Sequence, residues 1–266
     1  MIDRRIGQFP LKQSGSLSYR EAGAGQALVM LHGIGSSSAG WLYQLEELAR
    51  GFRVIAWDAP GYEGSAPLKD PKPTAALYAE ALHGLLERLL LKDVILVGNS
   101  LGGLFAGAYA RAHGERVRKM FLISPTSGYG VLDPSERQTK VSGRLQMLDE
   151  LGPEGMAEKR SPTLFGKKMT AENLELARWS QRRIHPVGYR QAVYCLDAGR
   201  HVEDAPHYRK PVLVVCGTED TVTPEAGCKK VAAAYPKGEY RALPGLGHVS
   251  HMEDPALING MLSGFA

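Results

Sequence analysis

Runs of apolar residues alternate with stretches of helical spacing along most of the chain. Several of the runs are uninterrupted, as in strands that are covered on both faces of a sheet. The predicted strands are Leu17–Glu21, Ala27–Leu31, Arg53–Trp57, Val94–Val97, Met120–Ile123, Val212–Cys216 and Tyr240–Leu243. Helical spacing marks Leu42–Ala49, Thr74–Leu91 and Leu101–His113. Strands that alternate with helices predict an α/β fold, with a mostly parallel central sheet and helices on both of its faces.

The strand pattern stops between Thr126 and Asp204. This segment is charged, has helical spacing and is interrupted at Pro134, Gly152–Pro153, Pro162 and Pro186. Its apolar and aromatic side chains could form the underside of a lid or a core of their own, and a core is the simpler interpretation for most of them. We therefore expect residues 1–125 and 205–266 to form the α/β core and residues 126–204 to form a helical insertion.

The composition of the 266-residue chain is that of a globular protein, with 44% hydrophobic and 23% charged residues. These values exclude a disordered tail, a collagen-like repeat and a coiled coil. The 32 Lys and Arg residues outnumber the 28 Asp and Glu residues by only 4, and they are spread along the chain. Nucleic acid is therefore not an expected partner.

The start of the chain and its cysteines indicate the compartment. Met1–Pro10 carries charges without the apolar stretch of a secretory signal behind them. No run approaches the roughly 18 apolar residues of a membrane helix, so no membrane partner is expected. The chain has three cysteines, an odd number, at Cys195, Cys216 and Cys228. They lack the spacing of metal ligands, and this fits a reducing environment. We expect a cytoplasmic protein.

The segment Val94–Gly103 runs from an apolar strand through Gly-x-Ser-x-Gly into a helix of small residues. Such a strand-to-helix turn strains the backbone of the central serine, here Ser100, and exposes its hydroxyl above the sheet. The pentapeptide alone is a weak signal in a chain with 31 glycines. The flanking strand and helix favour a nucleophile over the alternative, a serine that merely caps a buried helix.

A serine nucleophile needs a base within hydrogen-bond reach and a third group that orients the base. The apolar strand Val212–Cys216 leads to the carboxylates Glu219 and Asp220, and the strand that ends at Leu243 leads to His248 in a Gly-rich loop. Taken singly, the acid could be a turn or cap residue and the histidine a surface residue. Their joint placement after the ends of predicted strands favours catalytic roles.

The strand Ala27–Leu31 ends in His32-Gly-Ile-Gly35, a tight turn that offers backbone N–H groups. The tetrahedral intermediate of acyl transfer needs two donors at the developing oxyanion. We expect these to be the N–H groups of Leu101 and Ile34. His32 itself is expected to brace the loop rather than to react.

On these residues the chain resembles the α/β-hydrolase fold superfamily over essentially its whole length. The matching segments are the oxyanion loop at His32-Gly33, the nucleophile elbow at Gly98–Gly103, the acid loop at Gly217–Pro224, and the histidine loop at Gly247-His248 with Glu253 and Pro255. The resemblance implies that Asp220 rather than Glu219 is the acid, that His248 rather than His251 is the base, and that Thr126–Asp204 is a cap.

One segment departs from the family pattern. Asp58–Ser65 resembles the signature D-x-P-G-x-G-x-S, but Glu63 stands where glycine is usual. This departure puts the local turn in question and leaves the catalytic residues unaffected.

The subfamily indications are mixed. Ser100 argues against haloalkane dehalogenases and epoxide hydrolases, whose relatives use a carboxylate at that position. Asn99 resembles the elbow of C–C hydrolases of meta-cleavage products, but those enzymes usually carry tryptophan where this chain has Val249, and their oxyanion loop is richer in glycine. We therefore expect a serine hydrolase that forms an acyl-enzyme on Ser100 from small carboxylic esters or lactones. The alternative is hydrolysis of a carbon–carbon bond in a vinylogous diketone.

Two other classes of protein fit less well. Gly33-Ile-Gly35-Ser-Ser-Ser38, with Asp58 about twenty residues further on, resembles a dinucleotide fingerprint, but its third glycine is Ser38. Ser100, Asp220 and His248 also follow one another in the order expected for α/β-hydrolases, which an oxidoreductase would leave unexplained. A non-catalytic binding protein would not need all three residue types.

No metal and no cofactor is expected. His248 and His251 are three residues apart in a loop, and His201 and His207 lack a nearby ligand pair. Lys167-Lys168 and Arg182-Arg183 are most simply solvated helix faces, although a cation of the insertion could face a substrate carboxylate. The sequence does not predict the oligomeric state.

Overall fold

The computed structural model describes residues 2–266. Within them, eight strands form one sheet in the order β1-β2-β4-β3-β5-β6-β7-β8. Their bounds are β1 Lys12–Ser14, β2 Leu17–Ala22, β3 Gln26–Leu31, β4 Phe52–Trp57, β5 Val94–Asn99, β6 Val117–Ile123, β7 Val212–Gly217 and β8 Gly238–Leu243. The β1·β2 and β2·β4 pairs are antiparallel and the other pairs are parallel. The predicted α/β fold and its mostly parallel sheet are confirmed.

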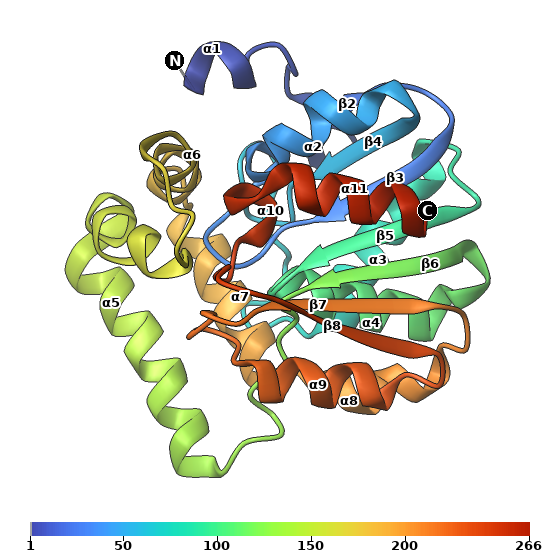
Figure 1. Cartoon of the computed structure of the whole chain (residues 1–266). Coiled ribbons are helices and arrows are strands. Elements are labelled where there is room, and N and C mark those ends of the chain that lie inside the picture. The colour runs from blue at the N-terminus through green and yellow to red at the C-terminus, as the bar shows by residue number, and fades with distance from the viewer. Residues whose placement is uncertain (1) are drawn as a thin grey trace.

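Helices cover both faces of the sheet (Figure 1). Outside the insertion they are α1 Ile2–Ile6, α2 Leu42–Glu47, α3 Ala75–Arg88, α4 Leu101–His113, α9 Glu225–Ala234, α10 Ser250–Glu253 and α11 Pro255–Phe265. Alternate residues of β3 point to opposite faces, because side chains alternate along a strand. Val29 and Leu31 pack in the core with α3, α4 and α9, whereas Leu28 and Met30 pack in the core with α2 and α11.

The chain between β6 and β7 forms the helices α5 Pro134–Arg160, α6 Ala171–Arg182, α7 Pro186–Ala198 and α8 His201–Asp204. Prolines begin α5 and α7, where a missing N–H leaves no hydrogen bond unmade. Gly152 kinks α5 with a φ of 59°, a backbone conformation that is unfavourable for residues other than glycine. In Figure 1, α5 and α6 stand to one side of the sheet, beyond the ends of its strands.

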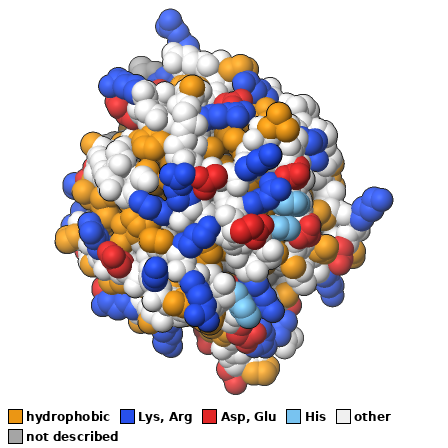
Figure 2. All heavy atoms as spheres, turned by 90° about the vertical axis from the view of Figure 1, so that its right-hand side faces the viewer, with side chains coloured by type: hydrophobic (Ala, Val, Ile, Leu, Met, Phe, Trp, Pro, Cys, Tyr) orange, Lys and Arg blue, Asp and Glu red, His pale blue; other side chains and the backbone are white. Residues whose placement is uncertain are grey.

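Figure 2 shows the face turned away from α5 and α6. Acidic and basic side chains are interspersed with apolar ones on this face, as the even spread of charge along the chain predicts. Of the helices in residues 2–266, none is both long and apolar enough to cross a bilayer.

Candidate active site

Ser100 lies in the sharp turn between β5 and α4. Its backbone has a φ of 54° and a ψ of −113°, a strained conformation that costs about 1–3 kcal/mol and persists only where the surroundings enforce it. The turn also requires close packing at Gly102, where an added Cβ would lie 1.9 Å from the carbonyl oxygen of Leu31. Glycine at position 102 therefore permits the sharp turn that presents the Ser100 side chain.

His248 and Asp220 meet beside this turn. Asp220 follows β7 and His248 follows β8, and the two side chains are buried. His248 Nδ1 lies 2.9 Å from Asp220 Oδ2. A carboxylate can only accept, so Nδ1 carries the proton and Nε2 is left free to act as an acceptor.

The carboxylate of Asp220 is held by several donors. Its Oδ1 accepts from the backbone N–H groups of Val222 at 2.8 Å and Thr223 at 2.9 Å, and its Oδ2 accepts from Thr223 Oγ1 at 2.9 Å. Burial raises the pKa of Asp220, but the attraction of His248 and these hydrogen bonds outweigh it and lower the pKa to about 2. Asp220 is therefore ionised at neutral pH.

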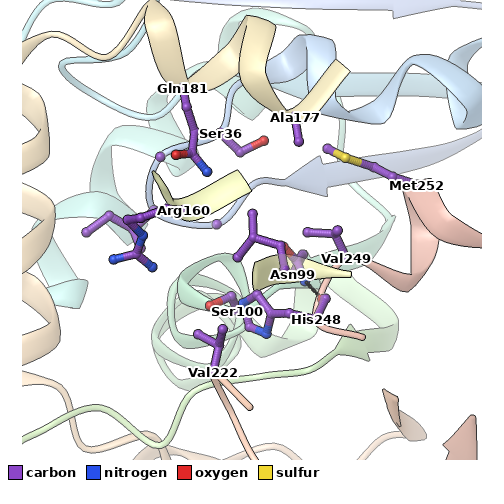
Figure 3. A pocket seen from close by; sticks show the side chains of 14 residues that line it. Ser36, Asn99, Ser100, Arg160, Ala177, Gln181, Val222, His248, Val249 and Met252 are labelled. Atoms are coloured by element: carbon purple, nitrogen blue, oxygen red, sulfur yellow. Dashed lines mark hydrogen bonds between the residues drawn. The ribbon is translucent and has the colours of Figure 1, made fainter. Parts of the chain in front are cut away.

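Ser100 and His248 line the same cavity (Figure 3). Asn99 joins their loops, because its Nδ2 donates to the carbonyl oxygens of Ile123 at 3.2 Å and His248 at 3.1 Å. Within the described residues, the His248 ring forms hydrogen bonds with Asp220 and Thr223 and none with Ser100. Such contacts are often long before a substrate is bound.

The loop after β3 lies directly beside Ser100, because a Cβ added at Gly33 would lie 3.2 Å from Ser100 Cβ. Ile34 lines the cavity. Leu101 does not, but it is the first residue of α4, so its N–H has no acceptor within the helix. His32 braces the loop: its Nε2 accepts from the N–H of Ala59 at 3.0 Å, and its Nδ1 donates to the carbonyl oxygen of Gly33 at 2.9 Å. Burial lowers the pKa of His32 to about 4 despite that second bond, so the ring is neutral.

Asp58 holds the far end of the same loop. It is fully buried and accepts from the N–H of Ser38 and the hydroxyl of Ser18, both at 2.7 Å. Burial raises the pKa of Asp58 to about 7 against the effect of these donors. The turn that follows keeps its left-handed shape, with a φ of 46° at Glu63. The departure from glycine therefore leaves the turn in place and strains it.

The other acid and histidines considered from the sequence do not line the cavity. Glu219 lies near the surface, 3.4 Å from Lys167. His251 is buried against Trp41, with the ring centroids 4.3 Å apart. His201 is buried and bonds to the carbonyl oxygen of Thr126 and the hydroxyl of Tyr235. Across residues 2–266, no group of three or more His, Cys, Asp or Glu side chains is placed to hold a metal ion.

Thr223 and Glu253 support the site, and sequence reasoning assigned neither of them a role. The two carboxylate oxygens of Glu253 accept from the N–H groups of Gly166, Lys168 and Gly247. Glu253 thus ties the histidine loop to the insertion. The Gly247-His248 pattern with an acid shortly after it is the only sequence signal for this contact.

The cavity above Ser100 is small and partly covered by residues of α5 and α6. Ser100 and His248 lie at its base, and Arg160 and Gln181 project into it from α5 and α6 (Figure 3). Apolar side chains that include Val222, Val249 and Met252 form much of the remaining wall. The cavity offers about 30 Å³ to water-sized contents, which is space for about two water molecules.

The fold and this site define a hydrolase of the α/β class. The family described as alpha/beta hydrolase fold matches residues 26–255, and the chain belongs to this family. Among its relatives in sequence is the 2-hydroxy-6-oxononadienedioate/2-hydroxy-6-oxononatrienedioate hydrolase 1 of Dechloromonas aromatica, 28% identical over 264 residues, which cover 94% of this chain and 90% of the relative. Another is the 2-hydroxy-6-oxo-6-phenylhexa-2,4-dienoate hydrolase of Burkholderia cepacia, 25% identical, with 92% of this chain and 89% of the relative covered.

Solved structures share the fold. The enol-lactonase from Burkholderia xenovorans superposes with a TM-score of 0.82 at 23% identity, with 96% of this chain and 99% of that chain covered. A malate-bound thermophilic esterase from Thermogutta terrifontis gives a TM-score of 0.84 at 23% identity, with coverage of 97% and 96%.

Proposed function

We propose that the protein hydrolyses small carboxylic esters or lactones through an acyl-enzyme on Ser100. The observation that carries this proposal is the buried pair of Asp220 and His248, 2.9 Å apart, at the cavity that Ser100 enters from a strained turn. A serine hydroxyl is a weak nucleophile until a base takes its proton. The arrangement supplies that base and the group that orients it.

In the proposed mechanism Ser100 Oγ attacks the substrate carbonyl while His248 Nε2 accepts the hydroxyl proton. Asp220 holds Nδ1–H and stabilises the imidazolium that forms. The N–H groups of Ile34 and Leu101 bind the oxyanion, a contribution worth about 10²–10³ in turnover for each donor. His248 then returns the proton to the leaving alcohol, and water attacks the acyl-enzyme by the same route to release the acid.

We propose that residues 126–204 act as a cap over this site. The helices α5 and α6 contribute Arg160, Ala177 and Gln181 to the cavity. Because the free space above Ser100 is about 30 Å³, which holds about two water molecules, a substrate enters when these helices move away from the oxyanion loop. Such cap motions admit substrate and exclude water during the reaction.

Hydrolysis of a carbon–carbon bond is the second candidate. The two relatives in sequence are dienoate or dienedioate hydrolases by name, and Asn99 fits this group. Val249 argues for esters, because it lines the cavity directly after His248, where those enzymes usually carry tryptophan.

A substrate panel with one variant tests the proposal. The wild type should cleave p-nitrophenyl acetate and butyrate or a simple lactone, and Ser100→Ala should lose at least about 10³–10⁴ in turnover while it remains folded. The matched control Ser142→Ala alters an exposed serine of α5 and should match the wild type. Ester hydrolysis retained in Ser100→Ala would refute the proposal, and a clear preference of the wild type for a 2-hydroxy-6-oxodienoate would favour the second candidate.

A further inference from the structure

Arg160 is the one Lys or Arg among the residues that line the cavity, and it lies at one end. Arg160, in the last turn of α5, projects into the cavity beside Gln181, while Val249 and Met252 lie toward the other side (Figure 3). Ser100 lies between these ends, at the base. A substrate carbonyl at Ser100 therefore has a guanidinium on one side and apolar side chains on the other.

Arg160 differs from the neighbouring arginines in its partners. Arg178 and Arg182 of α6 each form an ion pair with Glu158. In the described part of the chain, Arg160 forms no ion pair with a carboxylate, and the groups that favour its charged form are the nearby Tyr189 and Tyr129. The cavity therefore contains a positive charge that the protein does not neutralise.

A second arginine lies behind the first. Arg144 Nε donates to Tyr129 Oη at 2.7 Å and its Nη1 donates to Tyr189 Oη at 3.4 Å, and Tyr189 also lies near Arg160. Arg144 likewise forms no ion pair with a carboxylate among residues 2–266. Both lie near Tyr189, which belongs to an apolar cluster with Leu148 and Ile184.

Both arginines are half-buried, so water solvates their positive charges only in part, and no carboxylate of residues 2–266 pairs with them. Burial and the nearby charge of Arg144 both lower the pKa of Arg160, yet a guanidinium does not lose its proton in proteins, so the positive charge remains. The position of Arg160 at a helix C-terminus stabilises a cation only weakly. An anion that enters the cavity would supply the missing counter-charge.

We infer that the preferred substrates carry a free carboxylate, which Arg160 binds while the scissile carbonyl lies at Ser100. This inference rests on the proposed function and names its substrate class: hemiesters of short dicarboxylic acids, or lactones that bear a carboxylate. The planar guanidinium can bind both carboxylate oxygens at once.

The chemistry of the products follows from this assignment. Water adds across the acyl–oxygen bond, so a hemiester gives an alcohol and a dicarboxylate, and a lactone gives a hydroxy dicarboxylate. The first carboxylate is unchanged in the reaction. Its role is to fix the distance between Arg160 and the reacting carbonyl, which orients the substrate for attack.

A pair of substrates that differ only in charge tests the inference. Mono-p-nitrophenyl adipate is anionic, and its methyl ester is the neutral counterpart. The wild type should prefer the anionic ester in kcat/KM by about 10- to 100-fold, the range expected for a hydrogen bond between charged groups. In Arg160→Gln this preference should fall to near one, mostly through a higher KM for the anionic ester. Arg160→Lys should retain part of the preference.

The control for substitution itself is Arg137→Gln on the same helix. Arg137 pairs with Asp197 outside the cavity, so the variant should keep the wild-type preference. Equal kcat/KM values of the wild type for the two esters, or an unchanged preference in Arg160→Gln, would overturn the inference and leave the proposed function standing.

Binding without turnover separates the two claims. In Ser100→Ala, calorimetry should detect adipate, and Arg160→Gln introduced into this variant should weaken the affinity by a similar factor. Adipate binding that depends on Arg160 in a protein that cleaves no ester would support the anion site and refute the esterase. Absence of adipate binding in Ser100→Ala would overturn the inference.

Discussion

The replacement Asp220→Asn isolates the role of one oxygen. In the wild type Oδ1 accepts two backbone N–H groups, from Val222 and Thr223, while Oδ2 faces His248 Nδ1 and the Thr223 hydroxyl. Asparagine has one oxygen and one NH₂ group. The oxygen must stay with the two backbone donors, because the reverse orientation would place NH₂ against both of them.

The NH₂ group of the introduced asparagine then faces the His248 ring. Nδ1 must become the acceptor, so Nε2 carries the proton and can no longer take one from Ser100. A triad in the wrong tautomer loses about 10⁴ in turnover, which corresponds to about 5 kcal/mol in the activation barrier. The fold should persist, because the substituted side chain keeps the shape and the backbone hydrogen bonds of the original.

The assay is kcat for a p-nitrophenyl ester, with circular dichroism as a check of the fold. Glu219→Gln is the matched control, since Glu219 is the adjacent carboxylate and lies near the surface against Lys167. We expect this control to remain within about twofold of the wild type, as surface ion pairs contribute little. A loss of less than tenfold in Asp220→Asn, or a larger loss in Glu219→Gln, would refute the reasoning.

Two further predictions concern the support of the oxyanion loop. Burial raises the pKa of Asp58 from 3.8 to about 7. The fold therefore favours the protonated carboxyl, a contribution to stability that is complete below pH 3.8 and is lost as the pH rises through 7. Relative to Asp58→Asn, the free energy of unfolding of the wild type should fall by about 2–3 kcal/mol between pH 5 and pH 8 in urea titrations. Parallel pH dependences of the two proteins would contradict this. Glu63 has a left-handed backbone, so Glu63→Gly should raise the free energy of unfolding by about 0.5–1 kcal/mol, and a lower melting temperature would argue against strain at this turn.

The central part of the fold is readable from the sequence because local patterns determine it. The apolar runs at β3, β5, β6 and β7 mark strands buried on both faces, and the carboxyl ends of parallel strands meet at one edge of the sheet. This rule brings the loops of Ser100, Asp220 and His248 together without knowledge of any contact. The strand β1 was missed because Lys12–Ser14 is short, polar and located at the edge of the sheet.

The helices α9 and α11 escaped prediction for a different reason. Both helices are short, and the residues that bury them lie far away in sequence. Ile258 and Leu262 of α11, for example, pack in the core with Leu28 and Met30 of β3. Such partners are fixed by the tertiary arrangement.

The cation of the cavity could not be identified from the sequence either. The pairs Lys167-Lys168 and Arg182-Arg183 were the visible candidates. In the structure Lys167 and Lys168 pair with Glu219 and Asp254, Arg182 pairs with acidic residues of α5 and α6, and the Arg183 guanidinium lies over the Trp179 ring. Arg160 faces the cavity instead, because the kink at Gly152 redirects the end of α5 and breaks the helical periodicity.

Covalent labelling tests the central claim most directly. Treated with a fluorophosphonate, the protein should gain the mass of one phosphonyl group, on the peptide that contains Ser100, and ester hydrolysis should fall in proportion to the label. Ser100→Ala should gain no mass. Continued hydrolysis by fully labelled protein, or a label on another residue that alone tracks the loss of activity, would contradict the account.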